Sequence, residues 1–325
     1  WPDGDGRPGK LFSLDLLRVF LTFWIVSYHC VQNFNYFAYN NSNYVFTGFF
    51  GVECFFILSG FVLTYVNYER FNCETIGNFV NSYLKFVGSR FFRIWPLHAL
   101  ITFGWYMADP YCSWDYALKD ATFTDAIYTD VGNHCNAPSW FLHYEIYVCM
   151  CLPFVLVALK KFKWSVVPLA VASLALCWFY MTYVAPSWSI LASGSFIRGA
   201  ALFSLGTVVG FGFYLWPAQH TMFDLFAFVA FYFWNKTFMQ EHNETPSFYW
   251  PAILLSAFIM YCVSKGKVLN YIADNPAIAH LAEWSFAIYL VHWAFVKNTG
   301  PLIKGVDFTT SLTSFIMIVF VHYLM

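Results

Sequence analysis

The sequence predicts an all-α, polytopic membrane protein with about ten transmembrane helices. Hydrophobic residues make up 59% of the 325 residues and charged residues only 11%, whereas roughly a quarter of a soluble domain is charged. The apolar residues also come in blocks of about 20 residues, the length that a helix needs to cross a bilayer. The expected spans are 11–32, 47–67, 91–108, 138–159, 164–184, 195–214, 222–235, 249–264, 279–296 and 309–325.

The basic residues predict which way the chain enters the membrane. With a cytoplasmic N-terminus, eleven Lys and Arg residues lie in cytoplasmic segments, and the outer loops hold only Lys119, Lys236, Lys297 and Lys304. Basic residues concentrate in short cytoplasmic loops, so we expect a multi-pass integral membrane protein with its N-terminus inside. The N-x-S/T sequons that begin at Asn40, Asn235 and Asn243 all fall on the outer side in this arrangement.

The chain reads as one transmembrane domain over residues 1–325. It begins at Trp1 and stops at Met325 inside an apolar run, which would fit a chain trimmed at both ends. The longest polar segment, 109–137, contains Cys112 and Cys135. A disulfide between them is favoured if the outer side is oxidising, and two unpaired loop cysteines are the alternative. The other cysteines show no metal-ligand spacing, and we expect no bound metal.

The first span, "LDLLRVFLTFWIVSYHC", carries Arg18 and His29 inside an otherwise apolar run. Eleven positions make almost three helical turns, so the two side chains share one face and lie about 16 Å apart along the axis. A charge well inside a span costs about 2.5–3.5 kcal/mol even on mild insertion scales. Two such polar side chains on one face of the first span therefore indicate a polar cavity within the bundle.

The other buried polar groups fall into two layers when they are placed by depth. The inner layer is cationic, and the outer layer contains imidazoles and carboxylates. We place Arg18, Arg90 and Arg93 in the inner layer, and His29, Glu53, Glu145, Arg198 and His292 in the outer layer. Structural alternatives exist: Arg90 and Arg93 as anchors that reach lipid phosphates, His292 as a core histidine, and Glu53 with Arg198 as an ion pair between helices.

These two layers suit transfer from a phosphorylated donor. Arginine binds phosphate bidentately, and a histidine beside a carboxylate is a general base, because the carboxylate fixes its tautomer and stabilises the imidazolium. A long donor that enters from the cytoplasm could bring its reactive end to such a base. Acyl-CoA has that shape and charge.

Six short motifs occur in order along the chain. Arg18 and His29 form Arg-x10-His, and residues 51–61 read G-V-E-C-F-F-I-L-S-G-F, with Glu53 and the close-packing pair Ser59-Gly60. The others are R-x-x-R-I-x-P from Arg90 to Pro96, W-F-L-H-Y-E from Trp140 to Glu145, F-x-x-G at Phe203 and Gly206, and S-F-x-x-Y-L-x-H from Ser285 to His292.

With these motifs the chain resembles the membrane-bound acyltransferase family 3, polytopic O-acyltransferases that modify extracytoplasmic acceptors. The resemblance implies ten spans, a cytoplasmic acyl-CoA donor, usually acetyl-CoA, no permanently bound cofactor, and an acceptor hydroxyl presented from the other side. It also implies that the Arg18/His29 pair is essential. Phe141 stands where the family usually has serine, which puts a hydrogen-bonding role at that position in doubt.

We therefore expect an O-acyltransferase that acts on a carbohydrate or lipid-linked acceptor, in contact with membrane lipid and without nucleic acid. His29, Arg18, Glu53 and Glu145 are the expected catalytic residues, with Glu53 slightly preferred to orient His29. Arg90 and Arg93 are expected to bind the donor, and Arg198, His292, Trp140 and Ser59 to support the site or hold the acceptor.

Two other classes of protein are compared with this expectation. A secondary transporter for a polar solute would also bury Arg, Glu and His around a cavity, but the sequence lacks an internal repeat and helices broken near the midplane. A scaffolding membrane protein would not need Arg18 and Glu145. Transport is the second choice and a scaffold the third.

Overall fold

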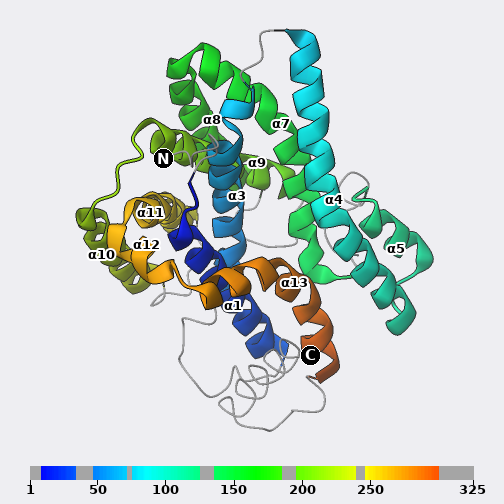
Figure 1. Cartoon of the computed structure of the whole chain (residues 1–325). Coiled ribbons are helices and arrows are strands. Elements are labelled where there is room, and N and C mark those ends of the chain that lie inside the picture. Colours follow the sequence, from blue (N-terminus) through cyan, green and yellow to red (C-terminus); the bar gives the residue numbers. More distant parts are fainter. Residues whose placement is uncertain are drawn as a thin grey trace.

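The computed structural model describes residues 9–33, 47–71, 75–124, 135–184, 195–238 and 246–299. Within these ranges the chain forms 11 α-helices and no strand, which confirms the predicted all-α class. Short 3-10 turns at Gly48–Phe50, Glu69–Phe71, Ala137–Ser139 and Lys163–Ser165 join or precede several of the helices. In Figure 1, α3 (Gly51–Asn67) lies in the middle, with α10 to α12 on one side and α4 and α5 on the other.

The tightest contact in the bundle joins α3 to α9 (Ser195–Leu215). A Cβ added to Gly60 would lie 2.0 Å from the Phe203 carbonyl oxygen, and one added to Gly206 would lie 2.0 Å from the Ile57 carbonyl oxygen. Glycine is the residue that lets two helix backbones approach this closely. The sequence motifs at Gly60 and Gly206 therefore mark one helix crossing.

The helix that carries Arg18 and His29, α1 (Phe12–Asn33), packs against α3 and against α13 (Pro276–Thr299). Its start is held by α12 (Lys267–Ala273), because the Ser13 backbone N–H donates to Asn270 Oδ1 at 3.1 Å. The first N–H groups of a helix have no partner within it, so a side chain from another helix caps α1. This cap fixes the position of α1 relative to α12.

The third predicted span is longer than the sequence suggested. We expected 91–108, but α4 runs from Ile76 to Ala108, begins with the Thr75 side chain as N-cap, and continues through Pro96. Polar residues are frequent in the N-terminal half of α4, so a search for apolar runs misses this half of the helix. Arg90 and Arg93 therefore lie about four turns inside a helix of about 50 Å, not at its first turn as predicted.

The polar segment that follows α4 is not a simple loop. It contains α5 (Trp114–Ala121), which the sequence did not predict, and a disulfide joins Cys112 to Cys135. The disulfide alternative is thus confirmed. The Trp95 indole donates to the Ala121 carbonyl, and Tyr147 donates to the Phe123 carbonyl. These contacts hold α5 and the residues that directly follow it against α4 and against α7 (Trp140–Lys161).

Three further helices complete the described bundle. They are α8 (Val166–Phe179), which continues as a π-helical turn Tyr180–Val184, α10 (Thr221–Phe238) and α11 (Pro246–Lys265). The helix α8 packs against α9, α11 packs against both α3 and α9, and α10 packs against α11. Residues 251–265 of α11 and the short α12 meet at a bend of 73°. The sequon at Asn235 lies in the last turns of α10, whereas those at Asn40 and Asn243 lie outside the described residues.

Several helices can cross a membrane. Among the described residues, four segments are long and apolar enough, namely Gly48–Asn67, Ala137–Lys161, Lys163–Val184 and Phe196–Leu215, and the bent pair of α11 and α12 makes up to five. These spans indicate a multi-pass membrane protein. Nine of the ten predicted spans overlap observed helices, and the tenth, 309–325, lies outside the described residues.

Two ion pairs join helix ends outside the predicted spans. Lys297 on α13 bonds to Asp109, directly after α4, and this hydrogen bond lowers the pKa of Asp109. At the other pair, Lys160 lies 2.8 Å from Glu69. Burial alone would raise the pKa of Glu69, but hydrogen bonds from Lys160 and Tyr214 outweigh burial and lower this pKa.

Candidate active site

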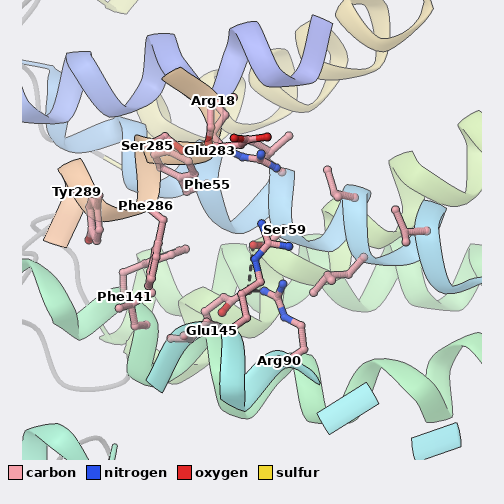
Figure 2. A pocket seen from close by; sticks show the side chains of 18 residues that line it. Arg18, Phe55, Ser59, Arg90, Phe141, Glu145, Glu283, Ser285, Phe286 and Tyr289 are labelled. Atoms are coloured by element: carbon pink, nitrogen blue, oxygen red, sulfur yellow. Dashed lines mark hydrogen bonds and ion pairs between the residues drawn. The ribbon is translucent and has the colours of Figure 1, made fainter. Parts of the chain in front are cut away.

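A cavity of about 230 Å³ lies among α1, α3, α4, α7 and α13. Three of the predicted residues on its wall are arginines, and they come from two helices: Arg18 from α1, and Arg90 and Arg93 from α4. Ser59 and Glu145 line the same space. Figure 2 shows Arg90, Ser59 and Glu145 grouped together, with Phe141, Phe286 and Tyr289 at one end.

Three polar side chains from three helices meet on the cavity wall, and two of them are charged. Arg90 donates from Nη2 to Glu145 Oε1 at 2.7 Å, and the Ser59 hydroxyl donates to the same oxygen at 3.0 Å (Figure 2). The Glu145 side chain is 3% exposed and that of Arg90 is 18% exposed. The carboxylate is therefore fixed by two donors while the guanidinium keeps access to the cavity.

The other two arginines make the cavity more cationic. Arg18 lies 3.3 Å from Asp15, which also pairs with Lys10 at 3.2 Å. Arg93 is exposed and lies one turn along α4 from Arg90. The lining thus holds three guanidinium groups and two carboxylates, those of Glu145 and Glu283. The excess positive charge suits an anionic ligand such as phosphate.

His29 lies outside the cavity lining, in contact with α13. Its ring centroid is 5.2 Å from that of His292 and 5.2 Å from that of Trp293. The His292 Nδ1 atom lies 2.5 Å from the Tyr289 carbonyl oxygen. A carbonyl can only accept, so Nδ1 carries the hydrogen and Nε2 carries the lone pair. The structure thus brings together two of the predicted residues, His29 and His292.

Tyr289 connects the two histidines with the cavity. Its ring lines the cavity, and its centroid is 5.7 Å from the His292 ring and 6.1 Å from the Phe141 ring. The Tyr289 hydroxyl donates to the Pro138 carbonyl at 2.5 Å. The cationic cavity and the histidine pair are therefore neighbouring parts of one region.

Glu53 and Arg198 form a separate, dry ion pair between α3 and α9. Arg198 Nε donates to Glu53 Oε2 at 2.9 Å, and Arg198 Nη2 contacts Glu53 Oε1. Both side chains are at most 1% exposed. The Arg198 guanidinium also lies 5.2 Å from the Trp140 ring centroid, a cation–π contact.

Of the five groups predicted to gather around one outer cavity, Glu145 lines the cavity of about 230 Å³. Among the described residues, the cavity lining includes Glu145 but not His29, His292, Glu53 or Arg198. The expected start of the third span at residue 91 places Arg90 at the inner mouth and far from Glu145, which the sequence places in the outer layer. Because α4 begins at Ile76, Arg90 lies about four turns from the start of this helix, and there it meets Glu145.

Sequence reasoning missed several residues of this region. Phe55, Glu283, Phe286 and Tyr289 line the cavity, and only the motif from Ser285 to His292 could have indicated the last two. It also missed a buried group of His98, Asp120 and His143, because these residues lie on three separate helices.

Comparison with protein families gives one match. The family model described as an acyltransferase domain matches residues 11–325. Neither the curated proteins nor the solved structures compared with the chain contain a match. Because the family match spans nearly the whole chain, this protein belongs to the acyltransferase 3 family and is a membrane-bound enzyme that transfers acyl groups.

Proposed function

We propose that this enzyme moves an acetyl group from cytoplasmic acetyl-CoA to a hydroxyl of an extracytoplasmic carbohydrate or lipid-linked acceptor. The observation that carries this proposal is the cavity lined by Arg18, Arg90 and Arg93. Planar guanidinium groups match phosphate oxygens in pairs, as the phosphates of CoA would require.

The size of the cavity favours a short acyl group. Its volume of about 230 Å³ lies below the roughly 300–1,000 Å³ of pockets that enclose a drug-sized ligand. A space of this size suits an acetyl thioester and the adjoining part of the pantetheine arm. The bulk of the coenzyme would then lie toward the exposed Arg93.

We assign the role of general base to His29. It takes the proton from the acceptor hydroxyl while the hydroxyl oxygen attacks the thioester carbonyl carbon; the C–S bond then breaks, and the departing CoA thiolate takes up the proton. His292 supports this step from the acceptor side, through the Nε2 lone pair that its hydrogen bond to Tyr289 leaves available.

Glu145 and Glu53 have different roles in this scheme. Glu145 positions Arg90 for the donor, since one oxygen of its carboxylate accepts from Arg90 and Ser59. Both oxygens of Glu53 face Arg198, so we now assign Glu53, Arg198 and Trp140 to the stability of the α3/α9 pair and not to the orientation of His29.

We further propose a single domain over residues 1–325 with ten spans and a cytoplasmic N-terminus. The distribution of basic residues supports this orientation. The short α10 supports the span count, because it exposes Phe228, Tyr232 and Phe233, apolar side chains of the kind that face lipid in a helix hydrophobic all round.

Proteoliposomes given radiolabelled acetyl-CoA test the proposal. Candidate carbohydrate and lipid-linked acceptors are supplied on the opposite side, and label should appear on an acceptor with the wild type. The His29→Ala variant should insert and fold but lose transfer by at least about a hundredfold. His280→Ala, which removes an exposed histidine from α13, should transfer normally.

Two results would contradict the assignment. Uptake of an intact solute without label on any acceptor would favour transport. Normal turnover in His29→Ala would leave the family activity in place but remove His29 as the base.

A further inference from the structure

Three buried side chains from three helices meet on the side of α4 and α7 next to α5. They are His98 on α4, Asp120 on α5 and His143 on α7, and all three are fully buried. Their possible ligand atoms all lie within 4.8 Å of one another. Asp120 Oδ1 is 2.8 Å from His143 Nε2 and 3.6 Å from His98 Nε2.

The carboxylate in this group is held in place by further donors. The Ser139 hydroxyl lies 3.0 Å from Asp120 Oδ1 and 2.7 Å from the Asn136 carbonyl oxygen, and its one hydrogen can be donated to either. The Asn136 backbone N–H donates to Asp120 Oδ2 at 3.4 Å. Asn136 directly follows Cys135, which the disulfide ties to Cys112. Such outer bonds orient a ligating carboxylate before a metal arrives.

We propose that His98, Asp120 and His143 form a binding site for a divalent transition metal of the zinc class. Two imidazoles and one carboxylate are a ligand set that zinc accepts, with Ser139 Oγ or a water as the fourth ligand. Bonds of about 2.0–2.1 Å in a tetrahedron separate ligand atoms by about 3.3–3.4 Å. The 3.6 Å distance fits this spacing, and the 2.8 Å distance has to widen by about 0.5 Å.

The ligand types also select against other metals. Magnesium and calcium prefer sites built from oxygen atoms, whereas Cu(I) prefers thiolate or thioether sulfur. The six free cysteines among the described residues lie elsewhere in the fold. A plain hydrogen-bond network is the competing explanation, since His98 Nε2 also lies 3.0 Å from the Asp120 carbonyl oxygen.

A metal at this site would bind α5 and the described residues before α7 to the helices of the candidate active site. It would join α5 to α4 and α7, and the segment between α5 and α7 already contacts α13. The Asn136 side chain donates to the Leu290 carbonyl at 2.9 Å, and Tyr289 donates to the Pro138 carbonyl. The metal would therefore hold the segment that borders Tyr289 and His292, and its role would be structural.

Metal analysis of the full chain tests the proposal. The protein is purified in detergent without chelator, and its zinc content is measured by mass spectrometry. Wild type and His280→Ala, an exposed-histidine control, should retain stoichiometric zinc. Asp120→Asn should lose it, because asparagine keeps the shape and an acceptor oxygen but removes the anionic ligand.

A second measurement does not depend on how well the variant folds. Wild-type protein is stripped with chelator, and Zn²⁺ or Mg²⁺ is added back during thermal unfolding. Zn²⁺ should restore the Tm and Mg²⁺ should not, because a ligand that binds only the folded state stabilises it. The proposal is overturned if the wild type retains no zinc and gains no Tm from it, or if Asp120→Asn binds zinc as the wild type does.

Discussion

The described residues include two Glu–Arg pairs whose acids, Glu53 and Glu145, the sequence assigned alike to catalysis, and the structure separates the two pairs. Glu53 and Arg198 are at most 1% exposed and lie between α3 and α9, where glycines bring the two backbones together. Glu145 and Arg90 form a bond of 2.7 Å on the wall of a cavity, and Arg90 is 18% exposed. Access to a cavity, more than burial, distinguishes a candidate functional charge from a structural one.

The physical cost of the two pairs also differs. A dry ion pair loses the hydration free energy of both charges. Only close geometry and further hydrogen bonds can offset this loss. The Glu53–Arg198 pair gains the Trp140 ring as an additional contact. The Glu145–Arg90 pair keeps an open side, so a ligand can add to its interactions.

The largest expected effect comes from breaking the dry pair. Arg198→Ala leaves the Glu53 carboxylate buried without its guanidinium, which costs about 3–5 kcal/mol of stability. Thermal unfolding in detergent should show a large fall in Tm or a failure to fold. Arg70→Ala, which removes an exposed arginine, is the matched control and should leave the Tm unchanged.

A double variant separates stability from catalysis at the same pair. Glu53→Leu with Arg198→Met replaces both charges by apolar side chains, which is often neutral or stabilising for a buried ion pair. We expect the double variant to fold and to transfer acyl groups. A folded double variant without activity would restore the catalytic role that the sequence suggested for Glu53.

At the Glu145–Arg90 pair we expect a loss of activity with little loss of stability. Glu145→Gln keeps shape and one acceptor oxygen but removes the charge that faces Arg90, so kcat/KM should fall about ten- to hundredfold with the Tm little changed. Kinetics on reconstituted protein measures this effect. If the Tm falls and the remaining folded enzyme works normally, Glu145 is structural as well.

Removal of the second donor to Glu145 should have a smaller effect. Ser59→Ala deletes one hydrogen bond of 3.0 Å and leaves the Arg90 contact intact. A loss of about 1 kcal/mol corresponds to about a fivefold fall in kcat/KM. The same kinetic assay tests this, and an effect as large as that of Glu145→Gln would mean that Ser59 contacts substrate.

The smallest expected effect is at the partly exposed pair of Asp109 and Lys297. The folded-state pKa of Asp109 is lowered by the hydrogen bond from Lys297, so the pair stabilises the fold above the unfolded-state pKa of about 3.9 and loses this contribution as the pH falls through the lower folded-state pKa. Such pairs contribute about 0.2–1 kcal/mol. The Tm difference between wild type and Asp109→Asn should be small at neutral pH and vanish at acidic pH.

The sequence predicted individual helices and local features better than the contacts between helices. The helix that carries Arg18 and His29, the close packing at Gly60, and the disulfide of Cys112 with Cys135 all follow from local patterns, and the structure contains each of them. Apolar length, small residues and cysteines in one polar segment are signals that a single stretch of chain carries.

The contacts of the site depend on helix ends and rotations, which no single stretch specifies. The polar first half of α4 concealed its start at Ile76, and this moved Arg90 in the predicted depth order. His98, Asp120 and His143 are 45 residues apart at their extremes and come from three helices, so their meeting depends on how α4, α5 and α7 pack against one another.

Binding of acetyl-CoA tests the central claim, that the cavity beside Glu145 receives the donor. Calorimetry should give at least about a hundredfold weaker binding for the Arg90→Ala/Arg93→Ala double variant than for the wild type, because two phosphate-binding guanidinium groups are lost. Lys85→Ala, which removes an exposed cation from the same helix, should bind like the wild type. Equal affinity in the double variant and the wild type would contradict the account and make Arg90 and Arg93 membrane anchors.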